Sequence, residues 1–238
     1  INFNKKKMKC VIMQPAYFPW AGYFYLIAES DKFVFLDDVQ YSKGSWQSKN
    51  FIISNKKKLL LTVPTKKSPL DTNIKDKIID NSLNFQKKHC KSINQVYANF
   101  PFFKDLEELI NFYMKLNSRN LSELNTEIII FISKKLNLNT NFYYSSNFNF
   151  EEKRTKKVIQ ILKKLNATEY LSPLGAKEYL KEDNFLKLTD IKLSFSSFKS
   201  TKYNQKNLED FVENLSIIDV IANLGWINTE SYVKENKF

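Results

Sequence analysis

The chain has 238 residues, of which 43% are hydrophobic and 26% are charged, a balance typical of a globular protein with a sizeable core. No apolar run approaches the roughly 20 residues that a membrane-spanning helix needs, and no signal peptide precedes the first predicted strand, so we expect a cytoplasmic protein. The formal net charge is +12, but the lysines are spread along the chain and only two arginines are present, Arg119 and Arg154. This pattern argues against sequence-specific nucleic-acid binding and favours a basic surface that meets an anionic small substrate.

The two cysteines, Cys10 and Cys90, predict neither a disulfide framework nor a metal pair. His89 adjoins Cys90, but sequence neighbours on a helix point in different directions, which argues against a Cys–His dyad. Residues 1–7, INFNKKK, are expected to form a disordered basic leader.

The first unit of the chain predicts a βαβ arrangement. A short apolar strand over 10–13 is broken by prolines and a glycine in 14–22, and apolar residues then recur at helical spacing over 23–28. A second apolar strand over 33–36 ends at two aspartates. Ligands of open α/β sheets bind beyond the carboxyl ends of the strands, so segments 14–22 and 37–40 are expected to lie side by side at one rim.

The remaining elements are predicted from turn residues and apolar periodicity. Up to residue 136 they comprise a hairpin ending at Pro64, a loop with one strand over 74–79, and helices from about 84 to 97, 103–116 and 118–136, the last capped by Ser118. After residue 136 the predicted strands are 141–145, 169–172 and 192–195. The predicted helices there are 151–166, 175–180, 208–215 and 217–224, the last stopped by Gly225. The fold class predicted is α/β, a Rossmann-like, doubly wound, mostly parallel sheet with a helical insertion or subdomain. The domain boundaries are 8–83 for an N-terminal α/β part with a hairpin, 84–137 for the helical insertion, and 138–230 for a C-terminal α/β part that completes the same domain.

Two residues are candidates for acid–base chemistry. Neighbouring side chains on a strand face opposite sides, so only one of Asp37 and Asp38 is expected to line a pocket, and Asp38 is preferred because Val39-Gln40-Tyr41 continues the polar rim. Such a pair is as often a solvated turn or a helix cap. His89 is the only histidine, so any imidazole mechanism must use it. Its place on an apolar helix face favours a satisfied, partly buried side chain instead.

Aromatic and polar residues near the predicted rim are candidates for ligand binding. Tyr17, Tyr23, Tyr41 and Trp46 could stack on sugar rings or bases, and they could equally fill the core. Lys49-Asn50 would supply a cation and an amide. The turn from Gln14 carries a single glycine, and the chain contains no Walker, GxGxxG, GxSxG or HExxH motif, so a dinucleotide cradle and a metal site are not expected.

Several motifs resemble the WbqC-like protein family. They are Met13-Gln14-Pro15 with Tyr17, Pro19 and Gly22-Tyr23-Phe24; Asp31-Lys32-Phe33-Val34 running into Asp37-Asp38-Val39-Gln40-Tyr41; Trp46 with Lys49-Asn50; Leu61-Thr62-Val63-Pro64; Lys88-His89; Tyr97 before Pro101-Phe102-Phe103; Ser145-Ser146; Tyr170-Leu171-Ser172 with Gly175-Ala176 and Tyr179-Leu180; Tyr203 with Gln205; and Leu215 to Asp219. The resemblance covers residues 8–230. Lys49 stands where the family commonly has arginine, and Pro173 where it often has glycine, which puts the turn before Gly175 in doubt.

The resemblance implies a transferase of bacterial surface-glycan biosynthesis, such as O-antigen or capsule, that N-acylates or aminoacylates an amino sugar, in our expectation nucleotide-linked. The donor would be an acyl-CoA, a carrier-protein thioester or an aminoacyl-tRNA, with no bound cofactor. Asp38 or His89 would be the base, Gln14 or Asn50 the oxyanion donor and Lys49 the phosphate contact. The full set of predicted substrate-binding residues is Gln14, Tyr17, Gly22, Tyr23, Asp37, Gln40, Trp46, Lys49, Asn50, Ser172 and Gly175. Two alternatives stay open: a nucleotide-dependent transferase or ligase on a nucleotidylyltransferase-like fold, and a non-catalytic glycan- or nucleotide-binding module.

Overall fold

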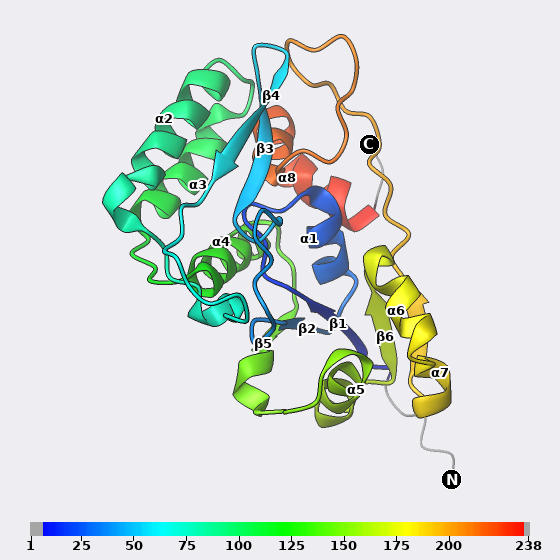
Figure 1. Ribbon diagram of the computed structural model, residues 1–238. Coiled ribbons are helices and arrows are strands. Elements are labelled where there is room, and N and C mark those ends of the chain that lie inside the picture. The colour runs from blue at the N-terminus through cyan, green and yellow to red at the C-terminus, as the bar shows by residue number, and fades with distance from the viewer. Residues whose placement is uncertain (1–6, 236–238) are drawn as a thin grey trace.

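The computed structural model describes residues 7–235, and a five-stranded sheet forms its centre (Figure 1). The strands are β1 (Lys9–Met13), β2 (Lys32–Phe35), β5 (Asn141–Tyr144), β6 (Glu169–Ser172) and β7 (Lys192–Phe195). Their order is β5-β2-β1-β6-β7, and every neighbouring pair is parallel. The chain first builds outward from β1 to β2 and β5 and then returns to the other side of β1. The predicted Rossmann-like parallel sheet is confirmed, and its strand order reverses between β1 and β6.

The predicted βαβ unit is β1, helix α1 (Ala21–Ala28) and β2. Side chains of β1 alternate between the two faces of the sheet, as the period of two in a strand requires. Val11 packs into the larger of two hydrophobic clusters, whereas Cys10 and Ile12 pack into the smaller one. Both faces are therefore apolar, which explains why β1 is a continuous apolar run.

One face of the sheet is covered by α1, the helical block and the last helix. The block comprises α2 (Phe85–Tyr97), α3 (Phe103–Lys115) and α4 (Leu121–Lys135), and the last helix is α8 (Ile217–Glu235). Beside them lies an antiparallel hairpin of β3 (Lys49–Ser54) and β4 (Lys57–Thr62), whose turn places Asn55 and Lys56 at positive φ. The buried residues of these elements and of this sheet face form one cluster. The boundaries 84–137 of the helical insertion stay a prediction.

The other face is covered by α5 (Arg154–Lys164), α6 (Lys177–Glu182) and α7 (Phe185–Leu188), which form the smaller cluster with Cys10, Ile12 and Val34. Four short 3-10 turns complete the fold: η1 (Ile74–Asp76), η2 (Asn81–Leu83), η3 (Ser145–Phe148) and η4 (Leu174–Ala176). Of the predicted leader, residues 1–6 lie outside the described part, and Lys7 pairs with Glu169 at 3.1 Å. No helix within residues 7–235 combines the length and the apolar character needed to cross a bilayer.

Two helix ends differ from the prediction. Helix α4 is capped by Asn120, whose side chain accepts from the Glu123 N–H at 2.9 Å, while the predicted cap Ser118 donates to Glu127. Helix α8 continues beyond Gly225, which adopts φ 71° and ψ 177° in its middle. The chain restarts the helix there because Asp105 accepts a hydrogen bond from the Trp226 N–H at 2.8 Å and so caps the second half.

Two further elements were wrongly predicted. Segment 74–79 forms the turn η1 and isolated bridges instead of a strand. Segment 208–215 is not helical: the Gln205 side chain donates to the Val212 carbonyl at 3.0 Å and accepts from its N–H at 2.7 Å. These bonds occupy backbone groups that a helix would use, and Asn214 has a positive φ of 58°.

Candidate functional site

A cavity of about 600 Å³ opens at the carboxyl ends of β1 and β6, where the strand order reverses. In open α/β sheets this reversal is the place where ligands bind. The lining comes from the end of β1 and the turn into α1, the end of β2, the loop before β3, and the segment after β6. It consists of Ile12, Met13, Gln14, Pro15, Ala16, Pro19, Trp20, Tyr23, Leu36, Ser45, Trp46, Gln47, Asn50, Tyr170, Pro173, Gly175, Ala176, Tyr179 and Asn214.

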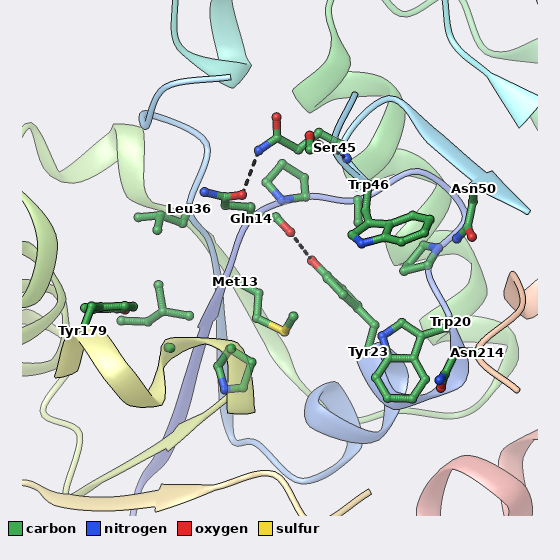
Figure 2. Close-up of a pocket in the computed structure, with 18 of the residues that line it drawn as sticks. Met13, Gln14, Trp20, Tyr23, Leu36, Ser45, Trp46, Asn50, Tyr179 and Asn214 are labelled. Atoms are coloured by element: carbon green, nitrogen blue, oxygen red, sulfur yellow. Dashed lines mark hydrogen bonds between the residues drawn. The ribbon is translucent and has the colours of Figure 1, made fainter. Parts of the chain in front are cut away.

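The lining is aromatic and carries amides, and none of its described residues bears a charged side chain. Figure 2 shows Trp46, Tyr23 and Trp20 along one side, with Tyr179 and Leu36 on the other. Trp46 is 57% exposed, so its ring is open to a ligand rather than used by the core. An uncharged cavity with exposed aromatic faces suits a sugar ring or a base, whose rings stack on such side chains.

Gly22 positions one of these aromatic walls. A Cβ atom at Gly22 would lie 2.3 Å from the Trp20 ring, so the indole packs directly on the glycine backbone. The ring also meets Phe198 edge-on, with ring centroids 5.4 Å apart. Gly22 therefore contributes to the cavity by leaving room for Trp20 and does not itself line it.

The side-chain amides of the lining differ in which of their hydrogen-bonding groups can contact a ligand. Asn50 donates to the backbone carbonyls of Tyr17 and Phe18 at 3.2 and 2.7 Å, and accepts from the Phe51 N–H at 2.8 Å. It is 5% exposed, and its role is to hold the turn that follows β1. Gln14 is exposed, and its Oε1 accepts from Gln47 Nε2 at 2.7 Å. Of the two predicted oxyanion donors, Gln14 is the one with an amide available.

Five of the predicted site residues line the cavity: Gln14, Tyr23, Trp46, Asn50 and Gly175. Lys49 precedes Asn50, and its Nζ lies 3.7 Å from the position of a Cβ on Gly44, beside the loop that carries Trp46. Ser172 is buried and donates to the Pro173 carbonyl at 3.2 Å. Gln40 lies apart from the cavity and donates to the Leu70 carbonyl at 2.7 Å.

Asp37 and Asp38 end β2 and belong to a buried polar cluster outside the cavity. Asp37 is 3% exposed and accepts from the Ser146 N–H at 3.1 Å and the Ser146 hydroxyl at 2.9 Å. Asp38 pairs with Lys157 of α5 at 2.6 Å, and both side chains are largely buried. The Ser145 hydroxyl contacts both carboxylates. These contacts join the end of β2 to η3 and α5, and they leave Asp38 facing a lysine instead of the cavity.

His89 and Tyr17 are buried together, also away from the cavity. His89 Nδ1 lies 2.8 Å from the Tyr17 hydroxyl, which lies 2.8 Å from the Tyr113 hydroxyl. Burial lowers the pKa of His89 from 6.5 to about 4, against a backbone hydrogen bond with Thr62 that favours the charged ring. Burial likewise raises the pKa of Tyr17 well above its usual value. The trio is neutral at pH 7 and ties the turn after β1 to α2 and α3.

Several residues that build the site were not predicted. Trp20, Gln47, Tyr170, Tyr179 and Asn214 line the cavity. Gln47 follows the predicted Trp46, and Trp20 lies two residues before the predicted Gly22, so the same turns could have indicated them. Lys157 gave no signal, because one lysine among many on a basic helix does not identify its partner 119 residues away. No group of three or more His, Cys, Asp or Glu side chains in residues 7–235 is arranged to hold a metal ion.

Comparison with known proteins gives the family. The model of the WbqC-like protein family matches residues 14–231. A relative in Mycobacterium tuberculosis (strain ATCC 25618 / H37Rv), described as uncharacterized protein Rv1507c, is 28% identical over 219 residues, which are 91% of this chain and 94% of that protein. No solved structure matches the chain. With a family match over nearly its whole length, the chain belongs to the WbqC-like protein family.

Proposed function

We propose that the protein is a cytoplasmic transferase of bacterial surface-glycan biosynthesis that N-acylates or aminoacylates an amino sugar carried on a nucleotide. The observation that carries the proposal is the uncharged cavity at the strand-order reversal, with its aromatic walls and its available Gln14 amide. A pyranose ring presents apolar faces to aromatic side chains and hydroxyls to amides. The sugar and the acyl group that it receives occupy the cavity in this proposal, and the nucleotide phosphates lie outside it, near Lys49.

The chemistry needs little from the cavity beyond orientation and a hydrogen-bond donor. The neutral amine of the sugar attacks the carbonyl carbon of a thioester or aminoacyl ester, and the carbonyl electron pair moves onto oxygen. The tetrahedral intermediate then expels the thiolate or the ribose hydroxyl, and the amine proton passes to the leaving group or to water. An N–H donor placed at the oxyanion accelerates this step by about 10²- to 10³-fold in enzymes that use one. Gln14 is the donor in this proposal.

Asp38 and His89 keep their status as predicted bases. Neither lines the cavity, and an amine that reacts in its neutral form supplies its own electron pair. Retained turnover in both Asp38→Asn and His89→Ala would exclude them as bases, and loss of turnover in a folded Asp38→Asn protein would support Asp38.

Turnover itself is tested by mixing the purified protein with UDP- or dTDP-linked amino sugars and each donor class, acyl-CoA, carrier-protein thioester and aminoacyl-tRNA. Mass spectrometry then detects the added acyl or aminoacyl group on the sugar. We expect a product that is lost in Gln14→Met and retained in Gln95→Met, which alters an exposed residue outside the cavity. No product with any donor would contradict the proposal.

The second candidate is a non-catalytic module that binds a glycan or nucleotide sugar. It is favoured by the absence of a carboxylate or imidazole among the described residues of the lining. Tight binding of an amino-sugar nucleotide without turnover would favour this candidate. The nucleotide-dependent ligase has less support, because the described lining offers no lysine or arginine for a triphosphate.

A further inference from the structure

We infer that Gln47 is a positioning residue that fixes Gln14 as a hydrogen-bond donor into the cavity, so that the site selects an uncharged acceptor oxygen of the ligand. The inference rests on the proposed function for the identity of that oxygen, which is the carbonyl oxygen of the acyl group that passes from the donor to the sugar. It adds what the proposal leaves open, namely which end of the Gln14 amide faces the ligand and what holds it there.

The direction of the Gln47 amide is set by a backbone group. The Ser42 N–H lies 3.2 Å from Gln47 Oε1, and a backbone N–H can only donate. The atom at that end of Gln47 is therefore an oxygen, and the other end is Nε2. Because Gln47 is 3% exposed, its amide has no solvent-facing alternative.

The orientation of the Gln47 amide fixes the orientation of the Gln14 amide. Gln47 Nε2 can only donate, so the Gln14 atom 2.7 Å from it is Oε1. Gln14 Nε2 then faces the opposite way, and Figure 2 shows that nitrogen on the side of Leu36, which also lines the cavity. Within residues 7–235, Gln14 Nε2 has no hydrogen-bond partner. Two N–H groups are thus presented to the cavity.

A buried amide from the helical block holds the two segments together. Asn125 of α4 is fully buried, and its Nδ2 donates to the carbonyl of Pro15 at 3.3 Å and to that of Gln47 at 2.8 Å. The Gln14 carbonyl in turn accepts from the Tyr23 hydroxyl at 3.1 Å. Both glutamines are therefore attached to backbone held by other elements, as a preorganised donor requires.

The cavity favours a neutral oxygen at this donor. An oxygen that is already anionic in water loses more solvation on entering a lining without a cation than one amide returns. The oxyanion of the proposed transfer is different, because it forms inside the cavity from a carbonyl oxygen that is bound while neutral. A carbonyl oxygen is a strong acceptor that loses less solvation. A ligand group that can only donate, such as an ammonium, would face the Gln14 N–H groups unpaired.

The test turns the Gln14 amide over by a substitution at position 47 that replaces the side-chain nitrogen with an oxygen. Glutamate at position 47 still accepts from the Ser42 N–H but cannot donate, so in Gln47→Glu the Gln14 amide must turn its Nε2 toward position 47 and its Oε1 toward the ligand. Binding of UDP-N-acetylglucosamine, a probe with an acyl carbonyl, is measured by calorimetry. We expect at least tenfold weaker binding in Gln47→Glu. Gln14→Glu, at an exposed position, also presents an oxygen and should lose as much if the buried variant folds poorly. Gln95→Glu makes the same chemical change outside the cavity and should bind like wild type.

Hydrogen exchange of the side-chain amides, measured by ¹⁵N NMR, tests without a ligand whether Gln47 sets the orientation of the Gln14 amide. In wild type the Gln47 NH₂ should exchange slowly and the Gln14 NH₂ rapidly, and in Gln47→Glu the Gln14 NH₂ should slow. Unchanged Gln14 exchange, or equal probe affinity in wild type and Gln47→Glu, would overturn the inference while leaving the proposed function standing. No probe binding by wild type would overturn the acyl-oxygen assignment and count against the proposed function, whereas the exchange result would still decide the donor direction.

Discussion

The buried histidine makes a quantitative prediction about stability and pH. Burial moves the pKa of His89 from 6.5 to about 4. A group whose pKa is depressed on folding binds fewer protons in the folded state, so its stabilising effect is complete above pH 6.5 and is lost as the pH falls toward 4. At about 1.4 kcal/mol per pKa unit, the full loss is about 3 kcal/mol, and about 2 kcal/mol of it should appear between pH 7 and pH 5.

The measurement is urea unfolding of wild type and His89→Gln at pH 7, 6 and 5. Glutamine does not titrate, and its side-chain oxygen can still accept from the Tyr17 hydroxyl. All other ionisable groups are common to the two proteins, so they cancel in the difference between the free energies of unfolding. We expect wild type to lose about 2 kcal/mol relative to His89→Gln between pH 7 and pH 5. Parallel pH profiles would refute the buried, neutral histidine.

Three substitutions test other parts of the structure. Lys157→Met leaves the Asp38 carboxylate buried without its partner and should lower the free energy of unfolding by about 3 kcal/mol. The double variant Asp38→Asn, Lys157→Met should recover most of that loss. Equal losses in the single and the double variant would contradict a buried pair. Gly225→Ala should lower the free energy of unfolding by about 3 kcal/mol, because the backbone angles φ 71° and ψ 177° are accessible only to glycine and a Cβ would lie 2.5 Å from Phe102. An unchanged melting temperature would contradict the kink in α8. Gly22→Ala displaces the Trp20 ring and should weaken UDP-amino-sugar binding in calorimetry by about tenfold, and unchanged affinity would show that Trp20 does not contact the ligand.

The rim of the sheet could be predicted because it depends on local signals. The apolar runs of β1 and β2 and the prolines between them identify a βαβ unit, and parallel strands end at the same edge. Gln14 follows from that rule, and Tyr23 and Trp46 were predicted as aromatic residues near the rim; all three line the cavity. The hairpin of β3 and β4 was predictable for a similar reason, since two apolar runs flank a short polar turn.

The catalytic candidates could not be placed from the sequence, because their surroundings come from distant segments. Asp38 meets Lys157 from α5, and His89 meets the Tyr17 hydroxyl, 72 residues away in the chain. The chemical identity of each side chain was visible, but its partner was not. The non-helical segment before α8 has a related cause, because the bonds of Gln205 to Val212 override the apolar spacing that predicted a helix.

The central claim is that the uncharged cavity binds an amino-sugar nucleotide, and thermal stabilisation tests it most directly. A ligand at 100 times its dissociation constant should add about 2.7 kcal/mol to the free energy of unfolding. Trp46 is 57% exposed, so Trp46→Ala should fold as stably as wild type and yet lose most of that gain. We predict stabilisation by a UDP- or dTDP-linked amino sugar in wild type that is largely absent in Trp46→Ala. Stabilisation by ATP or CTP alone, or equal stabilisation of both proteins by the sugar nucleotide, would contradict the account.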